Sequence, residues 1–290
     1  MVSGVWLDGN KVSSIDWILA GGTGFFAGVR AMTTMLAIGN RAIDFDRHIA
    51  RLLEHSTRMG MGEGPSPDLL RFDVETSLVG VFDYEWSRLR IVLFKDDNGT
   101  HHRLVSVASE STADIRLLKE KGLKLNLFRD PSWPRGAHVK TGFSGTRHIQ
   151  VERAKSSGFD DVLWINGDGE IAEATWSNLF LIGRTGDLVE IATPPASSGI
   201  LEGVTRRRIT ELLVSAKIPV TERVITEEEI PGFDEAFVTS SIRGLVAVTQ
   251  IGSHRLHTLR PNSVFGHISR LYQTWLGIEH PSDSSGLPVN

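Results

Sequence analysis

The chain has 290 residues and contains no cysteine, which excludes disulfides, thiolate metal sites and a cysteine nucleophile. Its hydrophobic fraction of 40% and charged fraction of 23% are those of a soluble globular protein with one large domain or two smaller ones. The formal net charge of -4 gives no support for a nucleic-acid or membrane surface. Neither a secretory signal nor an apolar run long enough to span a membrane is visible, so we expect a cytoplasmic enzyme or binding protein.

The first half of the chain predicts an alternation of strands and helices. Ile49, Leu52 and Leu53 recur at helical spacing after Asp46, a residue type that often caps a helix. Gly39-Asn40 separates two strand-like runs and therefore predicts a hairpin turn. The other expected elements of this half are strands at 4–8, 88–94 and 103–108 and helices from Asp46 to about Met59 and from Pro67 to Leu78.

The second half contains more strands and a possible domain boundary. "DVLWINGDGEIAEA" has alternating apolar residues on both sides of the turn at 166–169, which indicates a hairpin. A strand and a proline-bounded linker over 123–134 divide the chain into an N-terminal domain at 1–130, a C-terminal domain at 131–278 and a mobile tail at 279–290. The remaining expected elements are helices at 146–157, 204–216, 226–230 and 262–276, a hairpin about Thr185-Gly186 and strands at 218–224 and 236–238.

Several common catalytic motifs are absent from the sequence. It has no GxxxxGK[ST] phosphate loop, no HExxH, no histidine spacing typical of zinc and no G-x-S-x-G nucleophile elbow. The glycines at 21–28 lack the G-x-G-x-x-G spacing and precede a hairpin rather than a helix, which argues against a dinucleotide site. We therefore expect no metal site and no dinucleotide-binding site.

Two segments have the features of anion-binding cradles. Gly203-Val204-Thr205 stands at the start of a predicted helix, where free N–H groups and the helix dipole favour anions. Thr239-Ser240-Ser241 directly follows an apolar strand and offers several hydroxyl and N–H donors. A solvated helix face and a simple polar turn explain the same patterns, so both alternatives remain open.

Lys140 lies in "GAHVKTGFSGTRH", a glycine-rich segment with few other charges. An amine nucleophile must lose its proton, and small apolar neighbours can provide the desolvation that favours this loss. Glu173 alternates with apolar residues, so we expect it to point inward, where a carboxylate needs a partner. A lysine, an inward carboxylate and two phosphate cradles are what pyridoxal phosphate requires.

Five segments carry a resemblance to a known family. They are "HIARLLEHS", "HVKTGF", "GFDDVLWINGDGEIAEATWSNLFLI", "TPPASSGILEGVTRRRI" and "EAFVTSSIRGLVAV". Their order and spacing resemble those of the class IV aminotransferases, which are pyridoxal-phosphate enzymes of fold type IV. The resemblance implies an α/β (α+β) architecture with a small N-terminal α/β domain, a larger C-terminal pseudobarrel domain, pyridoxal 5'-phosphate between them and a homodimer.

The resemblance also implies roles for individual residues. Lys140 matches the catalytic lysine that forms the Schiff base, and Glu173 matches the carboxylate on the pyridine nitrogen. Lys140 would also move the proton between the substrate Cα and the cofactor C4′. The residues that match phosphate ligands are Arg51, Val204, Thr205, Ser240 and Ser241.

The substrate side of the resemblance is less uniform. Arg90 matches a region where some members hold a substrate carboxylate, although a surface-paired strand arginine explains it equally well, and Thr34 is a candidate lining residue. Ser144 replaces a tyrosine of the branched-chain members, Ala174 replaces the usual glycine, and "TT" at 33–34 resembles the aminodeoxychorismate lyase branch. We therefore expect an aminotransferase that acts on an amino acid or primary amine and a 2-keto acid. The alternatives are a lyase-type elimination and a non-catalytic binding protein on the same fold.

Overall fold

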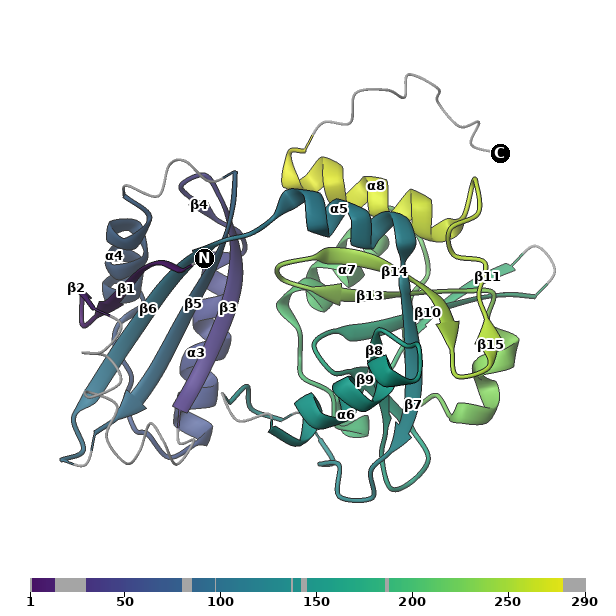
Figure 1. Ribbon diagram of the computed structural model, residues 1–290, viewed down its shortest axis with the longest axis horizontal. Helices are drawn as coiled ribbons and strands as arrows, with labels where there is room; N and C mark the ends of the chain where they lie inside the picture. The colour runs from purple at the N-terminus through teal and green to yellow at the C-terminus, as the bar shows by residue number, and fades with distance from the viewer. Residues whose placement is uncertain are drawn as a thin grey trace.

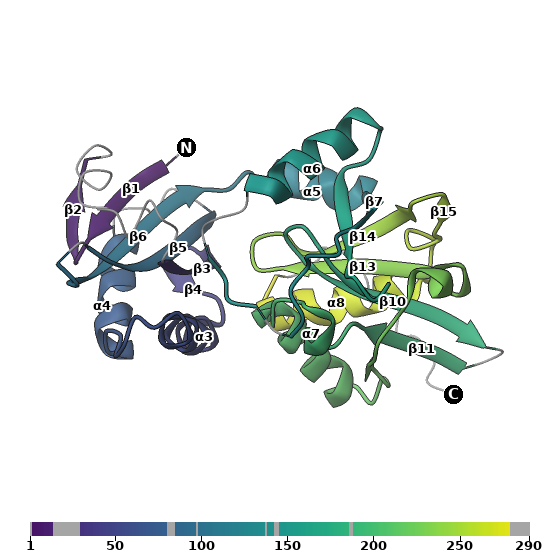
Figure 2. The ribbon, with the colours of Figure 1, turned by 90° about the horizontal axis from the view of Figure 1, so that it is seen from below.

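The computed structural model describes two units that lie side by side, each built on its own sheet (Figure 1). Figure 2 shows the same two units from below. The mixed α/β architecture expected from the sequence is confirmed. The described residues are 2–13, 30–79, 85–96, 98–136, 138–141, 145–185 and 188–278. Ser144, the glycine-rich 20–28 segment, Gly186 and the 279–290 tail lie outside these ranges.

The smaller unit is a six-stranded antiparallel sheet in the order β2-β1-β6-β5-β3-β4, covered on one face by two helices. Alternate residues of β3 and β5, such as Met35 and Leu89, are buried against Ile49 and Leu52 of the first helix. This period of two is typical of strands with one face on a core. The elements are β1 (Val2–Leu7), β2 (Asn10–Val12), β3 (Arg30–Ile38), β4 (Arg41–Ala42), α3 (Phe45–Arg58), α4 (Pro67–Leu78), β5 (Trp86–Lys95) and β6 (His101–Ser109).

The N-cap of α3 lies two residues before the predicted one. Its N-cap is Asp44, not Asp46, and Asp44 has a left-handed φ of 52° and makes no capping hydrogen bond with its side chain. The Asp44 carboxylate instead pairs with Arg208 of the larger unit and with Arg47. A tertiary ion pair has therefore replaced the local cap that the sequence suggested.

The larger unit is a nine-stranded mixed sheet in the order β12-β11-β10-β13-β14-β7-β8-β9, with β15 paired to β14. The β7 strand lies parallel to both β14 and β8, and β11 lies parallel to β12. The strands are β7 (Leu123–Arg129), β8 (Asp161–Ile165), β9 (Ile171–Ala174), β10 (Asn178–Thr185), β11 (Leu188–Thr193), β12 (Thr221–Glu222), β13 (Glu235–Ser240), β14 (Gly244–Ile251) and β15 (His254–Arg255). The helices are α5 (Thr112–Lys121), α6 (Gly145–Ser156), η1 (Ala196–Ser198), α7 (Val204–Ser215), η2 (Glu227–Gly232) and α8 (Val264–Leu276).

Both faces of the central strands of this sheet are buried. Leu179 and Leu181 of β10 pack on one face, whereas Phe180 packs on the other face against Phe237 at 4.8 Å between ring centroids. Helices α7 and α8 cover the second face. Leu36 and Ile43 of the smaller unit join this same cluster. The two units therefore share part of one hydrophobic core.

The chain passes from one sheet to the other between β6 and β7, through α5. Strand β7 precedes the boundary expected at residue 130 but takes its partners from the larger sheet, so the chain changes sheets one strand earlier than that boundary. Helix α5 was not anticipated, since Ile115 is its one buried residue and its apolar pattern is weak. The strand expected at 218–224 is reduced to the two residues of β12 at the sheet edge.

None of the helices within the described ranges is long and apolar enough to cross a membrane.

Candidate active site

The backbone of Lys140 is held by the smaller unit. Its N–H donates to Nδ1 of His55 at 3.0 Å, and its carbonyl accepts from the N–H of Met32 at 3.0 Å. The next residue, Thr141, forms an antiparallel bridge with Ala31 at the start of β3. Contacts on both sides of the peptide therefore fix where the lysine side chain begins.

The Lys140 amine has the electrostatic surroundings of a nucleophile. Burial, together with the positive charges of Arg51, Arg90 and Arg147, lowers its pKa to about 8. The negative charge of Glu173 acts in the opposite direction. A substantial neutral fraction is therefore present at mildly alkaline pH, and the neutral amine is the form that attacks a carbonyl.

Glu173 points inward from β9, as its alternation predicted, and only 3% of its surface is exposed. Its Oε2 accepts hydrogen bonds from the Leu201 N–H at 2.9 Å and from the Asn178 side chain at 3.1 Å. Its Oε1 lies 3.4 Å from Nη1 of Arg147 and 3.3 Å from Nε2 of His138. These donors satisfy a buried carboxylate, which would otherwise be costly.

Arg147 and His138 were not identified from the sequence. Arg147 comes from the first turn of α6 and lies over the Trp133 ring, 4.5 Å from its centroid. Its Nη2 lies 3.4 Å from Nε2 of His138, and Nδ1 of His138 lies 3.1 Å from the Gly199 carbonyl oxygen. The only sequence feature that could have identified His138 is its position two residues before Lys140. Arg147 lies on a different element from Glu173, so nothing in the sequence indicated that the two side chains meet.

Arg51 is a buried cation with an unused donor. Its Nη1 donates to the Glu202 carbonyl at 3.0 Å and its Nη2 donates to Oγ1 of Thr33 at 3.4 Å. Its Nε is buried and has no hydrogen-bond partner among the described residues. Burial lowers its pKa to about 10 because a desolvated guanidinium is costly, and the negative charges of three carboxylates (Glu173, Glu54 and Glu202) oppose this shift only in part. An anionic ligand at this position would satisfy both the charge and the free donor.

The start of α7 lies next to this arginine. Gly203 is its N-cap and provides no capping side chain, while Val204 and Thr205 are 5% and 6% exposed. Arg51 holds the carbonyl of Glu202, the residue before the cap. The N–H groups of the first helical turn have no capping side chain, and their binding of an anion stays a prediction.

The three arginines after this helix start have protein partners or face solvent. Arg206 donates to Thr193 and Pro194 and pairs with Glu222 at 3.1 Å. Arg208 pairs with Asp44, and the Arg207 side chain is 78% exposed. These arginines therefore add nothing to an anion site at the helix start.

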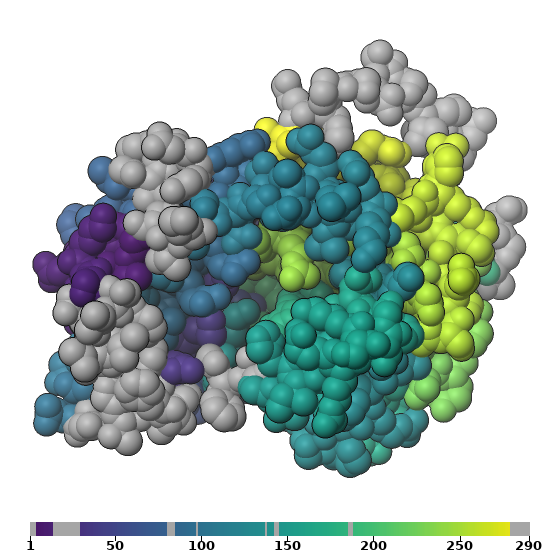
Figure 3. Space-filling model, in the orientation of Figure 1, coloured from purple at the N-terminus to yellow at the C-terminus, as the bar shows by residue number. Residues whose placement is uncertain are grey.

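Ser240 and Ser241 stand where β13 ends and the turn to β14 begins. Figure 1 shows this turn directed toward the smaller unit, and in Figure 3 yellow-green atoms of this region lie recessed between α5 and α6. Oγ of Ser241 lies 3.4 Å from Nε2 of His48 on α3, the helix that carries Arg51. The neighbouring Thr239 has a buried hydroxyl without a partner in the described structure. The second predicted cradle thus lies beside the first.

Thr34 and Arg90 face each other across neighbouring strands. They are direct partners in the β3–β5 register, and both are half-buried. The Arg90 Nε is buried without a partner among the described residues, and burial together with Arg88 lowers its pKa. Its charge is close enough to lower the pKa of Lys140. This position favours a ligand-facing arginine, although its role stays a prediction.

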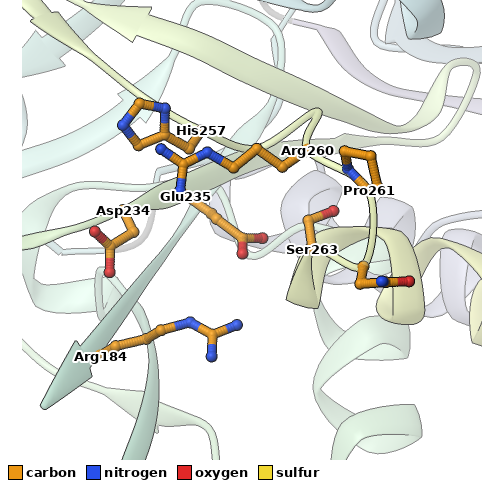
Figure 4. A pocket seen from close by; sticks show the side chains of 8 residues that line it. Arg184, Asp234, Glu235, His257, Arg260, Pro261 and Ser263 are labelled. Carbon is orange, nitrogen blue, oxygen red and sulfur yellow. The ribbon is translucent and has the colours of Figure 1, made fainter. Parts of the chain in front are cut away.

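A cavity lies away from these residues. It has a volume of about 280 Å³ and lies at the N-terminal end of β13, the end opposite Ser240. Figure 4 shows its charged lining, which contains both arginines and carboxylates; the lining side chains include Arg184, Asp234, Glu235, His257 and Arg260. Glu235 already accepts the N–H groups of Val264 and Phe265 at the start of α8. Because the charges of this lining balance, the cavity indicates no particular ligand.

Comparison with known proteins supports one family. The sequence pattern described as "Amino-transferase class IV" matches residues 30–251. The probable branched-chain-amino-acid aminotransferase of Thermotoga maritima is 32% identical over 143 residues, which cover 47% of this chain and 51% of that protein. The mitochondrial branched-chain-amino-acid aminotransferase 1 of Arabidopsis thaliana is 35% identical over 164 residues, which cover 51% of this chain and 41% of that protein. The matches thus span about half, or less, of the length of these relatives.

A solved structure shows the same fold over nearly the whole chain. The apo form of a hypothetical aminotransferase from Mycobacterium tuberculosis superposes with a TM-score of 0.80 and 18% identity. The superposition covers 94% of this chain and 98% of that protein. The fold IV-transaminase CpuTA1 of Curtobacterium pusillum also superposes, with a TM-score of 0.72 and 17% identity over 85% of this chain and 86% of that protein, so the fold is that of the type IV transaminases.

Proposed function

The chain belongs to the class IV aminotransferase family, and from this premise we propose that it is a pyridoxal-phosphate-dependent aminotransferase. It would move an amino group between an amino acid or primary amine and a 2-keto acid. The observation that carries the proposal is the grouping of a low-pKa lysine, a buried and hydrogen-bonded carboxylate and a buried arginine with an unused donor.

The described residues fit the cofactor at each of its functional ends. Arg51, the first turn of α7 and the serines after β13 would hold the phosphate, and the free Nε of Arg51 is the donor that lacks a partner. Glu173 would hold a proton on the pyridine nitrogen, and Lys140 would bond to the aldehyde carbon as a Schiff base. When bound, pyridoxal phosphate supplies the carbonyl that accepts the amino group and the ring that withdraws electrons from Cα.

Lys140 would then act as the acid–base group. Its Nζ, once released from the cofactor, would take the proton from the substrate Cα and return it at C4′. A pKa of about 8 suits this exchange because the amine holds and loses a proton near neutral pH. The hydrogen bond from its peptide N–H to His55 and the contact with Met32 would keep the side chain within reach of both carbons.

We propose that Arg90, with Thr34, holds a carboxylate of the substrate. The partly buried guanidinium has an unpartnered Nε, and Arg88, two residues earlier, already pairs with Glu110 at 2.7 Å. Arg90→Met should raise KM for an amino acid about tenfold or more, because a charge-assisted hydrogen bond contributes about 1.5–3 kcal/mol. Arg88→Met is the matched control and should leave KM nearly unchanged. An equal effect on a primary amine that lacks a carboxylate would contradict the assignment.

The direct test is formation of a cofactor adduct at Lys140. Protein incubated with pyridoxal phosphate should gain a visible absorption band, and borohydride should fix the cofactor on the peptide that contains Lys140. Lys140→Ala should show neither signal. A protein that stays colourless and is not labelled would favour a non-catalytic binding protein. Release of pyruvate from aminodeoxychorismate, without amine transfer to a keto acid, would favour the elimination reaction.

We also propose a cytoplasmic homodimer, which the family resemblance supports. Light scattering of the purified protein should give a mass about twice the 31.9 kDa of one chain. A single-chain mass with full activity would contradict this part of the proposal.

A further inference from the structure

A line of buried side chains connects the two predicted phosphate contacts across the units. Nη2 of Arg51 lies 3.4 Å from Oγ1 of Thr33, which lies 2.8 Å from Nδ1 of His48. Nε2 of His48 lies 3.4 Å from Oγ of Ser241 in the larger unit. Thr33 is fully buried and His48 is 2% exposed, so water does not compete for the contact between them, whereas Ser241 at the end of the line is half-buried.

The donors and acceptors along this line have one consistent direction. A guanidinium has only donors, so Oγ1 of Thr33 must accept from Arg51. The threonine hydrogen then has Nδ1 of His48 as its acceptor. If Thr33 accepted from both neighbours, its own hydrogen would have no acceptor among its described contacts, at a cost of about 1–3 kcal/mol in a buried place.

The imidazole of His48 links the hydrogen bond of Thr33 to that of Ser241, so the donor at one side determines the donor at the other. Burial, together with the charges of Arg51 and Lys140, keeps its pKa well below the ordinary value, so the ring is neutral and carries one hydrogen. With Nδ1 as the acceptor, that hydrogen lies on Nε2 and points to Oγ of Ser241. The serine oxygen is then engaged as an acceptor, and its own hydrogen is left for another group.

We propose that Thr33 and His48 are positioning residues that turn the hydroxyl hydrogen of Ser241 toward the cofactor phosphate. This inference rests on the proposed function, since it assigns a phosphate to the space between Arg51 and Ser241. Phosphate oxygens are acceptors, so a serine that donated to His48 would instead present lone pairs to them. The relay thus makes Ser241 a donor before the ligand arrives, which reduces the cost of binding.

The first test reads the relay without the cofactor. Nitrogen NMR of the full-length apoprotein, labelled at histidine, should show a neutral His48 with hydrogen on Nε2 and none on Nδ1. A hydrogen on Nδ1, or a doubly protonated ring at pH 7.5, would overturn the proposal. Thr33→Val, which removes the hydroxyl at nearly constant volume, should shift the ring toward a mixture of both neutral forms.

The second test isolates the phosphate. Equilibrium binding to the apoprotein is compared for pyridoxal phosphate and for pyridoxal, which lacks the phosphate. His48→Phe should weaken binding of pyridoxal phosphate about tenfold, the equivalent of one hydrogen bond, and leave pyridoxal binding within about twofold. Ser56→Ala is the matched control, because Ser56 lies buried on the same helix and its hydroxyl has no described partner.

The double variant decides whether His48 acts through Ser241. In a Ser241→Ala background, His48→Phe should have less than about a twofold effect on pyridoxal phosphate binding. An undiminished effect in that background, or an equal loss for pyridoxal, would overturn the relay. If wild-type protein forms no visible band with either aldehyde, the proposed function fails, whereas the His48 tautomer can still be measured.

Discussion

Gly203 connects the predicted phosphate cradle to the carboxylate of Glu173. A Cβ at this position would lie 2.0 Å from Oδ1 of Asn178, although the backbone angles of φ -69° and ψ 133° suit any residue. Asn178 is 5% exposed and cannot move freely, because its Nδ2 donates to Glu173 at 3.1 Å and to the Leu201 carbonyl at 2.8 Å. Gly203→Ala should therefore displace Asn178 and break both hydrogen bonds. Their loss should destabilise the protein by about 2–3 kcal/mol.

Urea unfolding of the apoprotein measures this loss directly. The midpoint should fall with an unchanged m-value, and pyridoxal phosphate affinity should fall as well, since Glu173 loses a donor. Gly232→Ala is the matched control, because no neighbouring atom lies within 4 Å of the position that a Cβ would take there and the φ of Gly232 is not positive. It should stay within about 0.5 kcal/mol of wild type. If Gly203→Ala is equally neutral, Asn178 is not held as the structure implies.

Three further predictions concern titration and helix capping. In the apoprotein, labelling of Lys140 by a small amine-reactive reagent should increase with pH, with a midpoint near pH 8. Glu173→Gln should lower that midpoint, because the charge of Glu173 raises the pKa of Lys140. A midpoint above pH 10 would contradict the burial of the amine. Burial lowers the pKa of His55 to about 4 in the folded protein, below its value near 6.5 in the unfolded chain. Between these two pH values the unfolded chain binds a proton that the folded protein does not. The free energy of unfolding should therefore fall by about 2 kcal/mol from pH 6.5 to pH 4. His55→Asn, which keeps an acceptor but does not titrate, should lose less in urea unfolding over this range, and an identical loss would refute the assignment. Glu235→Gln should cost about 1–2 kcal/mol, since one buried carboxylate accepts two N–H groups at the start of α8, and an unchanged urea midpoint would contradict that count.

The sequence predicted the local elements of this fold well and the joints between them less well. Alternation and helix signals placed β3, α4 and the β8–β9 hairpin, because these patterns depend on neighbours a few residues away. The N-cap of α3 differs from the prediction because an ion pair with Arg208 holds Asp44 there. The domain boundary differs because β7 pairs with β14 of the larger sheet. Both partners lie more than a hundred residues away along the chain.

The same division holds for the candidate site. Lys140 among glycines and Glu173 alternating with apolar residues suggested their chemistry from residue type and neighbours alone, and the resemblance of five segments named the family. The approach of Arg147 to Glu173 and of His48 to Ser241 depends on how α6 and α3 pack against the larger sheet. Sequence periodicity determines which face of an element is buried. The partner that the buried face meets is decided only when the two sheets close on their shared core.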